Sequence, residues 1–404
     1  MNRASYLEFR TSRDKPLAGA RSHERRTEKS KTETAMKNDT AEWTPERTEY
    51  RDDATGARVI RLTAAPCINH PLYYLTNSFT PDSRALVFAS NRTGKYDLFR
   101  ADIETGAIRR LTAEAGLAPF SGNVVGNDVY FTTTDGNVWR LDLTTGEARV
   151  VAGCAGGGLG EVTINATGSL GCALVTKAGQ AGLLVFQTDG SGSHVILDGV
   201  RALYHPQFHP TDPELLIYSA DPPDPRLWTV RSDGRDDRCF YANQRDEWFV
   251  HEPFLGRSDR VIVVCWHRGL HEVDLRSGAI LTIREFSSWH IASNSDGSRI
   301  VCDTHLPDIG LCLVNPATGE FEVLCHPKAT SQGSQWREPL PLPADGGAPG
   351  WATMTEKVTA ESAYGPQWTH PHPSFSPDDR WVSFTSDESG TPQVYVVQVP
   401  GGQP

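Results

Sequence analysis

The stretch from Gln367 to Phe375 contains the side chains whose types and spacing point most directly to chemistry. It reads Gln-Trp-Thr-His-Pro-His-Pro-Ser-Phe, so that His370 and His372 stand two positions apart. Residues two apart share one face of an extended strand, and the neighbouring prolines favour the exposed start of an edge strand, because they cannot donate to a β-ladder. Two imidazoles on one face, just after Gln367, suit a first-row transition metal such as manganese, iron, nickel or zinc. Turn histidines on a surface strand are the simpler alternative for this stretch taken alone.

The charge of the chain narrows the classes of partner. Its 404 residues carry a formal net charge of -11, which argues against nucleic acid and against an anionic membrane surface as partners. No apolar run is long enough to span a bilayer. If the ligand is an anion, positive charge must be concentrated locally, by a metal ion or by arginines in a cleft.

The cysteines and the N-terminal segment indicate a reducing compartment. None of the eight cysteines has CxxC spacing, and most lie in apolar runs such as the one ending at Cys265, which is the pattern of buried free thiols. Residues 1–45 are polar, without hydrophobic periodicity and without the apolar segment of a signal peptide, so we expect a disordered extension and a cytoplasmic protein. Met36 is an alternative start, and the folded domain is expected to span residues 46–404.

Two segments near opposite ends of the chain repeat one pattern. Residues 79–94 and 375–390 both read as an aromatic residue, a Pro-Asp turn, an alternating strand and a polar turn, and each is followed by a further strand, at 96–101 and 393–397. A second marker is a turn before each outer strand, ending in Gly106, Gly146, Gly190, Gly234, Gly278 and Gly319. Intervals of about 40–45 residues with four short strands each are the signature of a β-propeller. The sequence therefore predicts an all-β, seven-bladed propeller with almost no helix.

The blades can be placed, and the ring can be closed. Inner strands are expected near residues 70, 115–120, 158–165, 205, 251, 290 and 370. The strand at 57–63 resembles an outer strand but precedes the first blade, so we expect it to complete the last blade and leave no open edge. Residues 326–366 form a long loop between blades six and seven, and loops of that length are functional or disordered.

Histidines recur where the inner strands are expected to begin. They are His70, His205, His251, His290 and His370, with His372 two residues after the last. In a propeller these points converge on the mouth of the central channel. His290 of blade six could therefore join His370 and His372 of blade seven, with Gln367, around one cation. His251 of blade five would lie next to them, free to act as an acid or base. The simpler alternative is that each histidine hydrogen-bonds within its own blade turn.

An arginine could bind an anionic ligand at the same mouth. Arg226 precedes the expected third strand of blade four, and its guanidinium could bind a carboxylate through two hydrogen bonds; an ordinary surface salt bridge is the alternative. Glu252 could orient the adjacent His251 or only cap a turn. The chain has no GxSxG elbow, no P-loop and no GxGxxG after a strand, which leaves serine hydrolases, NTPases and dinucleotide enzymes without support.

Four motifs together resemble the oligogalacturonate lyases of polysaccharide lyase family 22. They are residues 69–74 (Asn-His-Pro-Leu-Tyr-Tyr), 250–254 (Val-His-Glu-Pro-Phe), 289–297 (Trp-His-Ile-Ala-Ser-Asn-Ser-Asp-Gly) and 369–379, which includes Thr-His-Pro-His-Pro-Ser-Phe. The resemblance covers roughly residues 50–400 and implies a seven-bladed propeller with a manganese-type divalent ion. By motif, it assigns the metal ligands to His290, Gln367, His370 and His372, the catalytic base to His251 and the substrate arginine to Arg226.

The function that this resemblance implies is β-elimination from short oligogalacturonides in pectin degradation. The partner would be a small anionic oligosaccharide, for which His205 and His70 are further candidate binding residues. Neutral His251 would take the C5 proton, while water or His205 would protonate the leaving oxygen. Blades two and three look short and glycine-rich, which leaves a different uronide open as the substrate. A non-catalytic, TolB-like interaction propeller is the alternative outside enzymes.

Overall fold

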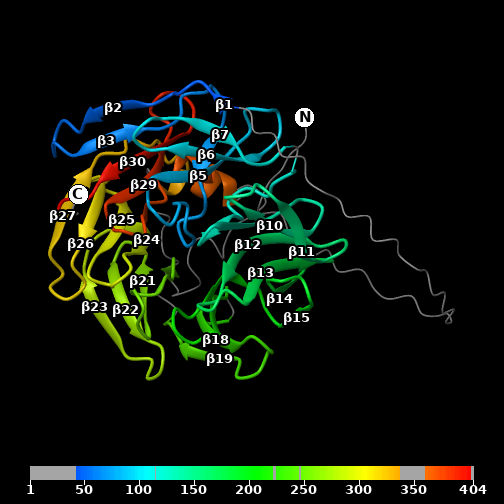
Figure 1. Ribbon diagram of the computed structural model, residues 1–404. Helices are drawn as coiled ribbons and strands as arrows, with labels where there is room; N and C mark the ends of the chain where they lie inside the picture. The colour runs from blue at the N-terminus through cyan, green and yellow to red at the C-terminus, as the bar shows by residue number, and fades with distance from the viewer. Residues whose placement is uncertain (1–41, 114, 222–223, 245–246, 337–359, 402–404) are drawn as a thin grey trace.

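The strands of the described residues form seven antiparallel sheets arranged around a ring (Figure 1). The computed structural model describes residues 42–113, 115–221, 224–244, 247–336 and 360–401. First strands of neighbouring sheets contact one another, β8 with β12, β12 with β16 and β24 with β28, so that these strands line the centre of the ring. The predicted seven-bladed propeller is confirmed.

Five blades have four strands each. From the inner to the outer strand, blade two is β8 (Asn123–Val125), β9 (Asp128–Thr132), β10 (Asn137–Asp142) and β11 (Ala148–Gly153), and blade three is β12 (Gly158–Ile164), β13 (Leu170–Lys177), β14 (Gln180–Gln187) and β15 (Ser193–Ile196). Blade four is β16 (Tyr204–Phe208), β17 (Leu215–Ser219), β18 (Leu227–Arg231) and β19 (Arg238–Tyr241). Blade five is β20 (Phe249–Val250), β21 (Arg260–Cys265), β22 (Gly269–Asp274) and β23 (Ile280–Arg284), and blade six is β24 (Ser288–Ser293), β25 (Ile300–Thr304), β26 (Leu311–Val314) and β27 (Phe321–Cys325).

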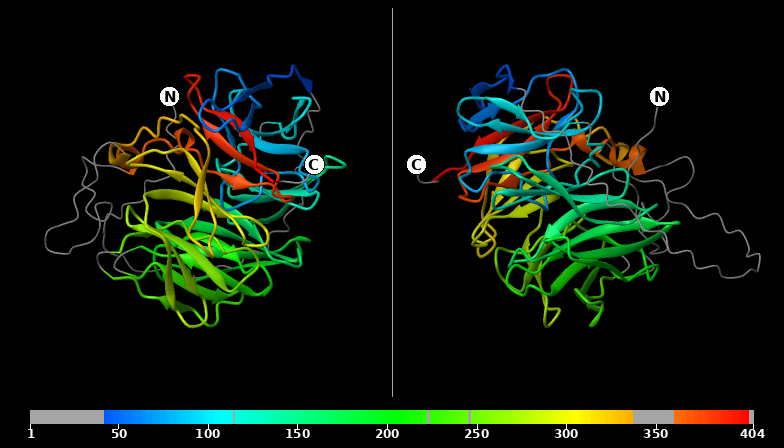
Figure 2. Two further views of the ribbon diagram at one scale, coloured as in Figure 1. Left: turned by 90° about the vertical axis from the view of Figure 1, so that its left-hand side faces the viewer. Right: turned by 45° about the vertical axis from the view of Figure 1, so that its right-hand side comes forward.

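The first and last blades have five strands because the N-terminal segment supplies their outer edges. Blade one is β4 (Asn69–Pro71), β5 (Ala85–Ser90), β6 (Asp97–Asp102), β7 (Ile108–Arg110) and β1 (Glu42–Trp43), and blade seven is β28 (Ser374–Phe375), β29 (Trp381–Ser386), β30 (Gln393–Gln398), β3 (Arg58–Arg61) and β2 (Thr48–Arg51). In all views, the blue N-terminal strands lie beside the red C-terminal ones (Figure 2). The pairing of Val59 with Val397 confirms that the strand expected at 57–63 completes the last blade.

Two details of the expected boundaries differ. The inner strand of blade two begins at Asn123, a few residues after the expected 115–120, where Leu117 makes only an isolated bridge to Thr133. Most of the expected extension 1–45, including Met36, lies outside the described residues. Its described end, Glu42–Trp43, pairs with β7.

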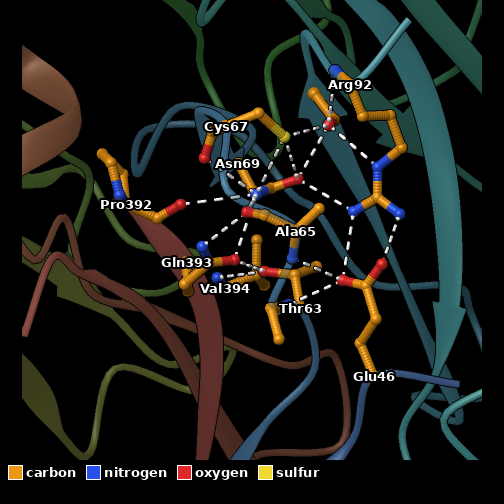
Figure 3. A network of polar contacts seen from close by, with 11 residues as sticks. Glu46, Thr63, Ala65, Cys67, Asn69, Arg92, Pro392, Gln393 and Val394 are labelled. Carbon is orange, nitrogen blue, oxygen red and sulfur yellow. Dashed lines mark hydrogen bonds and ion pairs between the residues drawn. The ribbon is translucent and has the colours of Figure 1, made fainter. Parts of the chain in front are cut away.

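A buried polar network holds the closure between blades one and seven (Figure 3). Gln393 accepts hydrogen bonds from Thr63 (2.7 Å) and Asn69 (3.0 Å) and donates to the carbonyl of Ala65 (2.9 Å). Arg92 donates to Asn69 (2.9 Å) and to Glu46 (3.0 Å). The N-terminal segment is thus fastened to both blades by side chains as well as by β-pairing, directly beside His70.

The apolar core is divided among the gaps between blades. Alternating side chains of each sheet pack against the next sheet, as Ile262 and Val264 of blade five pack with Ile291 of blade six. Trp266 and Trp289 belong to the same packing cluster. All eight cysteines are unpaired, and no helix among the described residues is long and apolar enough to cross a membrane.

The long loop 326–366 has structure of its own where it is described. Three short helical segments lie in and just after it: η1 (Ser334–Trp336), α1 (Ala360–Tyr364) and η2 (Gln367–Thr369). The indole N–H of Trp336 donates to the carbonyl of Tyr364 (2.8 Å), which joins the two described ends of the loop. This contact brings both residues to the blade-seven histidines described below.

Candidate metal centre and active site

Three histidines meet at the junction of blades six and seven. The ligand nitrogens of His290, His370 and His372 lie within 4.8 Å of one another, and all three residues are buried. The rings of His290 and His372 are 3.9 Å apart between centroids, and His290 and His370 are 5.4 Å apart. The expected convergence of these residues is therefore present in the structure.

The backbone that brings His370 and His372 together is not the exposed edge strand that the sequence suggested. His370 follows the single turn η2, and the two histidines are 0% and 2% exposed. His372 has a φ of 47°, in the left-handed region that few residues other than glycine adopt. Strand β28 begins only at Ser374. The expectation failed because the side-chain alternation of a strand does not apply to a turn followed by a left-handed residue.

Irregular backbone recurs at the other central positions. His205 and His251 also have positive φ, 51° and 58°. The pairing of β24 with β25 shifts register between Ser288 and Ile291, which is a bulge at His290. Bulges and left-handed residues redirect a side chain that a regular strand would point into a blade face. Such backbone at three or more equivalent positions indicates that the histidines are aimed at a common point.

Two acceptors fix the rings of the metal-ligand candidates from outside. Asp303 accepts a hydrogen bond from Nδ1 of His290 (2.7 Å), and the backbone carbonyl of Tyr364 accepts one from Nε2 of His370 (2.6 Å). Each bond leaves the other ring nitrogen as the one that can face a ligand. Metal-binding histidines are held in this way by a carboxylate or carbonyl.

The unused nitrogens fit a bound cation. Nδ1 of His370 and both ring nitrogens of His372 are buried without a hydrogen-bond partner, although buried polar atoms nearly always have one. Burial lowers the pKa of His290 and His372 well below the ordinary value, and the neighbouring imidazoles lower it further. The rings are therefore neutral and carry the lone pairs that a divalent transition metal needs. Gln367, the predicted fourth ligand, is half-buried at the start of η2, where its carbonyl accepts the N–H of His370 (3.1 Å).

His251 lies beside this cluster. Its ring centroid is 4.6 Å from that of His290 and 4.7 Å from the indole of Trp289. Its Nδ1 is buried and unpartnered. Burial, and then the neighbouring His205, lower the pKa of His251 well below its ordinary value, so the ring is neutral at pH 7. An unprotonated nitrogen in a buried polar space can accept a proton from a bound molecule.

Arg226 lies in a partly buried ion-pair network and not in a surface salt bridge. Its guanidinium donates to Glu252 (2.5 Å) and to Asp221 (2.9 Å), and it precedes β18 as predicted. Glu252 also accepts from Nδ1 of His205 (3.0 Å) and from Ser219 (2.6 Å). Glu252 therefore positions Arg226 and His205, whereas the sequence suggested that it orients His251 or caps a turn. Burial raises its pKa, but Arg226 and His205 together hold it below the ordinary value.

Residues of blade one close the space on the other side. His70 is fully buried, stacks on Phe120 at 4.0 Å and has an unpartnered Nε2. The hydroxyl of Tyr73 is 3.0 Å from Nε2 of His205. The ring of Tyr74 lies parallel to that of His372, with its centroid 5.5 Å away, and its hydroxyl is buried and unpartnered. Side chains of blades one, four, five, six and seven thus touch one another at the centre of the ring.

Sequence reasoning missed several members of this site. Tyr73 and Tyr74 stand inside a motif that carried the family resemblance, and that motif was the available signal for them. Asp303 lies in the apolar strand β25 and is 1% exposed; a lone carboxylate in a buried strand was the signal to notice. Tyr364 contributes a backbone carbonyl, which no side-chain pattern can reveal.

Comparison with known protein families and curated proteins finds oligogalacturonate lyases. The sequence model of the oligogalacturonate lyase family matches residues 44–177 and 357–403. The chain is 24% identical over 401 residues to the oligogalacturonate lyase of Dickeya dadantii, and 24% identical over 387 residues to the oligogalacturonide lyase of Pectobacterium atrosepticum. Each alignment covers 87% of this chain and 95% of the relative.

Solved structures of the same fold are also similar. An oligogalacturonate lyase in complex with manganese superposes with a TM-score of 0.74 at 22% identity, covering 90% of this chain and 99% of that one. An oligogalacturonate lyase from Vibrio parahaemolyticus superposes with a TM-score of 0.75 at 21% identity, with the same coverage. The propeller fold is therefore shared along nearly the whole length of these proteins.

Proposed function

We propose that this chain, which belongs to the oligogalacturonate lyase family, is a metal-dependent lyase that cleaves short oligogalacturonides by β-elimination. The observation that carries the proposal is the buried group of three histidines, two of which have unpartnered ring nitrogens, beside a fourth neutral histidine. A scaffold propeller has no use for buried polar atoms that lack partners, because each costs about 1–3 kcal/mol. In an enzyme, by contrast, a bound ligand can supply the missing partners of these atoms.

We assign the metal to His290, His370 and His372, with Gln367 as the fourth ligand, and manganese as the ion. The related lyase whose structure contains manganese supports this choice of ion. When bound, a divalent cation would neutralise the uronate carboxylate and act as a Lewis acid toward it, which makes the C5 proton more acidic.

The charges around the site favour this dependence on a cation. Arg226 is partly buried between two carboxylates, Glu252 and Asp221, so its positive charge is largely offset. The protein side chains alone offer little net attraction to an anion. A divalent cation would supply the net positive charge that the ion-paired arginine does not, and Arg226 would serve as an oriented hydrogen-bond donor to the substrate.

The reaction requires removal of the C5 proton and loss of the C4 oxygen. His251 takes the C5 proton on its unpartnered nitrogen, since burial keeps the ring neutral. The C4–O bond then breaks as the C4–C5 double bond forms, and the leaving oxygen gains a proton. We assign that donation to His205 and the Tyr73 hydroxyl bound to it. His70, stacked on Phe120, would border the sugar ring.

The proposal extends to the substrate and to the location of the enzyme. The substrate is a galacturonide of a few residues, and a different uronide would use the same residues. We place the protein in the cytoplasm because its eight cysteines are all unpaired, as is usual in reducing compartments.

A substrate panel with metal control tests this proposal. The protein is stripped with a chelator, resupplied with manganese, and mixed with digalacturonate, trigalacturonate and other uronic-acid disaccharides. We expect near-ultraviolet absorbance of a 4,5-unsaturated uronate with the galacturonides, only in the presence of metal. No absorbance with any uronide would favour a non-catalytic interaction propeller, and cleavage of another uronide alone would correct the substrate.

A further inference from the structure

We propose that Asp303 is a positioning residue that fixes the tautomer of His290 and thereby prepares the metal centre. The proposal rests on the metal site of the proposed function and assigns a role to a residue that touches neither substrate nor metal. Asp303 belongs to β25, the second strand of blade six, and it is 1% exposed.

Both oxygens of this carboxylate are used. Oδ1 accepts the backbone N–H of His290 (2.7 Å), and Oδ2 accepts Nδ1–H of the same residue (2.7 Å). A further backbone hydrogen bond comes from His372. One side chain therefore holds the ring and backbone of one ligand candidate and the backbone of another that comes from the next blade.

The hydrogen-bond pattern determines which nitrogen of His290 carries the proton. An acceptor at Nδ1 places the proton there and leaves the lone pair on Nε2. Nε2 is then the nitrogen that a cation can bind. If the proton moved to Nε2, the ring would present a donor to the metal, and binding would require a tautomer change at the cost of the Nδ1 bond.

The substitution Asp303→Asn would change the tautomer of His290 while nearly preserving the shape of the side chain at position 303. The amide oxygen would have to stay near the backbone N–H groups, so the amide NH₂ would face Nδ1 of His290. Nδ1 would then become an acceptor and the proton would move to Nε2. The opposite amide orientation would set NH₂ against the backbone N–H. Asparagine is nearly isosteric with aspartate. One amide orientation nevertheless moves the proton of His290 to Nε2, and the other removes the acceptor of the backbone N–H group.

The same carboxylate also affects the net charge of the site. Three neutral histidines and a neutral amide would leave the ion its full charge, as the ligand types alone suggest. A buried carboxylate bound to a ligand raises the basicity of that ligand and offsets part of the charge. Asp303 therefore strengthens metal binding while it tempers the attraction of the site for anions.

The chain contains a matched control at its periphery. Asp52, in the turn after β2, accepts the backbone N–H of His326 (2.9 Å) and lies 3.3 Å from Nδ1 of the same residue. Asp52 is 5% exposed, so it is, like Asp303, a buried carboxylate that contacts a histidine. His326 is not one of the clustered histidines. Asp52→Asn should therefore change packing and stability but not metal binding.

Manganese binding to chelator-stripped protein tests the proposal without any lyase assay. Isothermal titration calorimetry, checked by the electron paramagnetic resonance signal of free Mn²⁺, is run on wild type, Asp303→Asn and Asp52→Asn. We expect Asp303→Asn to weaken binding by about 10–100-fold and Asp52→Asn to leave it within about twofold. Unchanged affinity in Asp303→Asn would overturn the proposal, and a wild type that binds no Mn²⁺ would overturn the proposed metal site as well.

A second measurement remains available if Asp303→Asn does not fold. Wild-type protein labelled with ¹⁵N-histidine reports the tautomer of each ring in the metal-free state, and His290→Gln assigns the signal. The proposal expects the proton of His290 on Nδ1. A proton on Nε2 would contradict it, whatever the variants do.

Discussion

The rings of His290 and His372 are 3.9 Å apart between centroids, although they belong to different blades. Both are buried, and burial keeps both neutral by lowering their pKa. Two neutral imidazoles with converging lone pairs form a site for a cation, and the bulge at one and the left-handed backbone at the other hold them there. The interface between blades six and seven is thus the part of the fold that forms the proposed metal site.

Removing one candidate metal ligand should abolish metal binding without unfolding the propeller. His372→Ala deletes a ring whose two nitrogens have no hydrogen-bond partner in the protein, so the substitution removes no hydrogen bond made by this ring. We expect elemental analysis to find manganese in the wild type and almost none in the variant. His271→Ala, in β22 of blade five, is the control and should retain the metal. Metal retained by His372→Ala would remove this residue from the site.

Acid should destabilise the protein through its buried histidines. Burial lowers the pKa of His70 to about 4, whereas in the unfolded chain it is about 6.5. Between these values the unfolded state binds more protons, so the free energy of unfolding falls as pH falls from about 6.5 toward 4.

Comparison of urea unfolding at pH 7 and pH 5 measures this effect. His70→Phe, beside Phe120, should reduce the difference between the two pH values, and substitution of the exposed His194 should not. If His70→Phe leaves the pH dependence unchanged, the ring of His70 does not titrate as its burial implies.

Loss of one amide in the closure network should weaken the whole fold. Gln393 is 1% exposed and bonds to Thr63, Asn69 and Ala65, so Gln393→Ala leaves buried polar groups unpaired. We expect a loss of about 1–3 kcal/mol in the free energy of unfolding. Gln398→Ala, exposed on the same strand, should change it by less than about 0.5 kcal/mol. Equal effects of the two substitutions would show that the network contributes no stability.

The sequence was sufficient for the architecture because the blade repeat is local. Turn glycines such as Gly106 and Gly319 have positive φ and mark the same point of each blade, and the strand at 57–63 copies an outer strand. The histidines were found because they occupy equivalent points of that repeat. The geometry of the propeller brings those points to the centre of the molecule.

The rest of the site depends on tertiary contacts that leave no local pattern. The left-handed backbone of His372 could not be seen in a stretch that reads as a strand. Asp303 looks like one polar residue in an apolar strand until the fold places His290 against it. Tyr364 orients His370 through its backbone carbonyl. A loop whose sequence has no periodicity brings this carbonyl close to the histidine.

The most direct test compares His251→Ala with the wild type in one preparation, measuring bound manganese and lyase activity on digalacturonate. His251 is next to the three clustered histidines without being one of them. The account predicts that the variant retains manganese and loses activity by about 10²–10⁴-fold. A variant that retains both metal and activity would contradict the assignment of His251 as the base. A wild type with neither would contradict the proposed function itself.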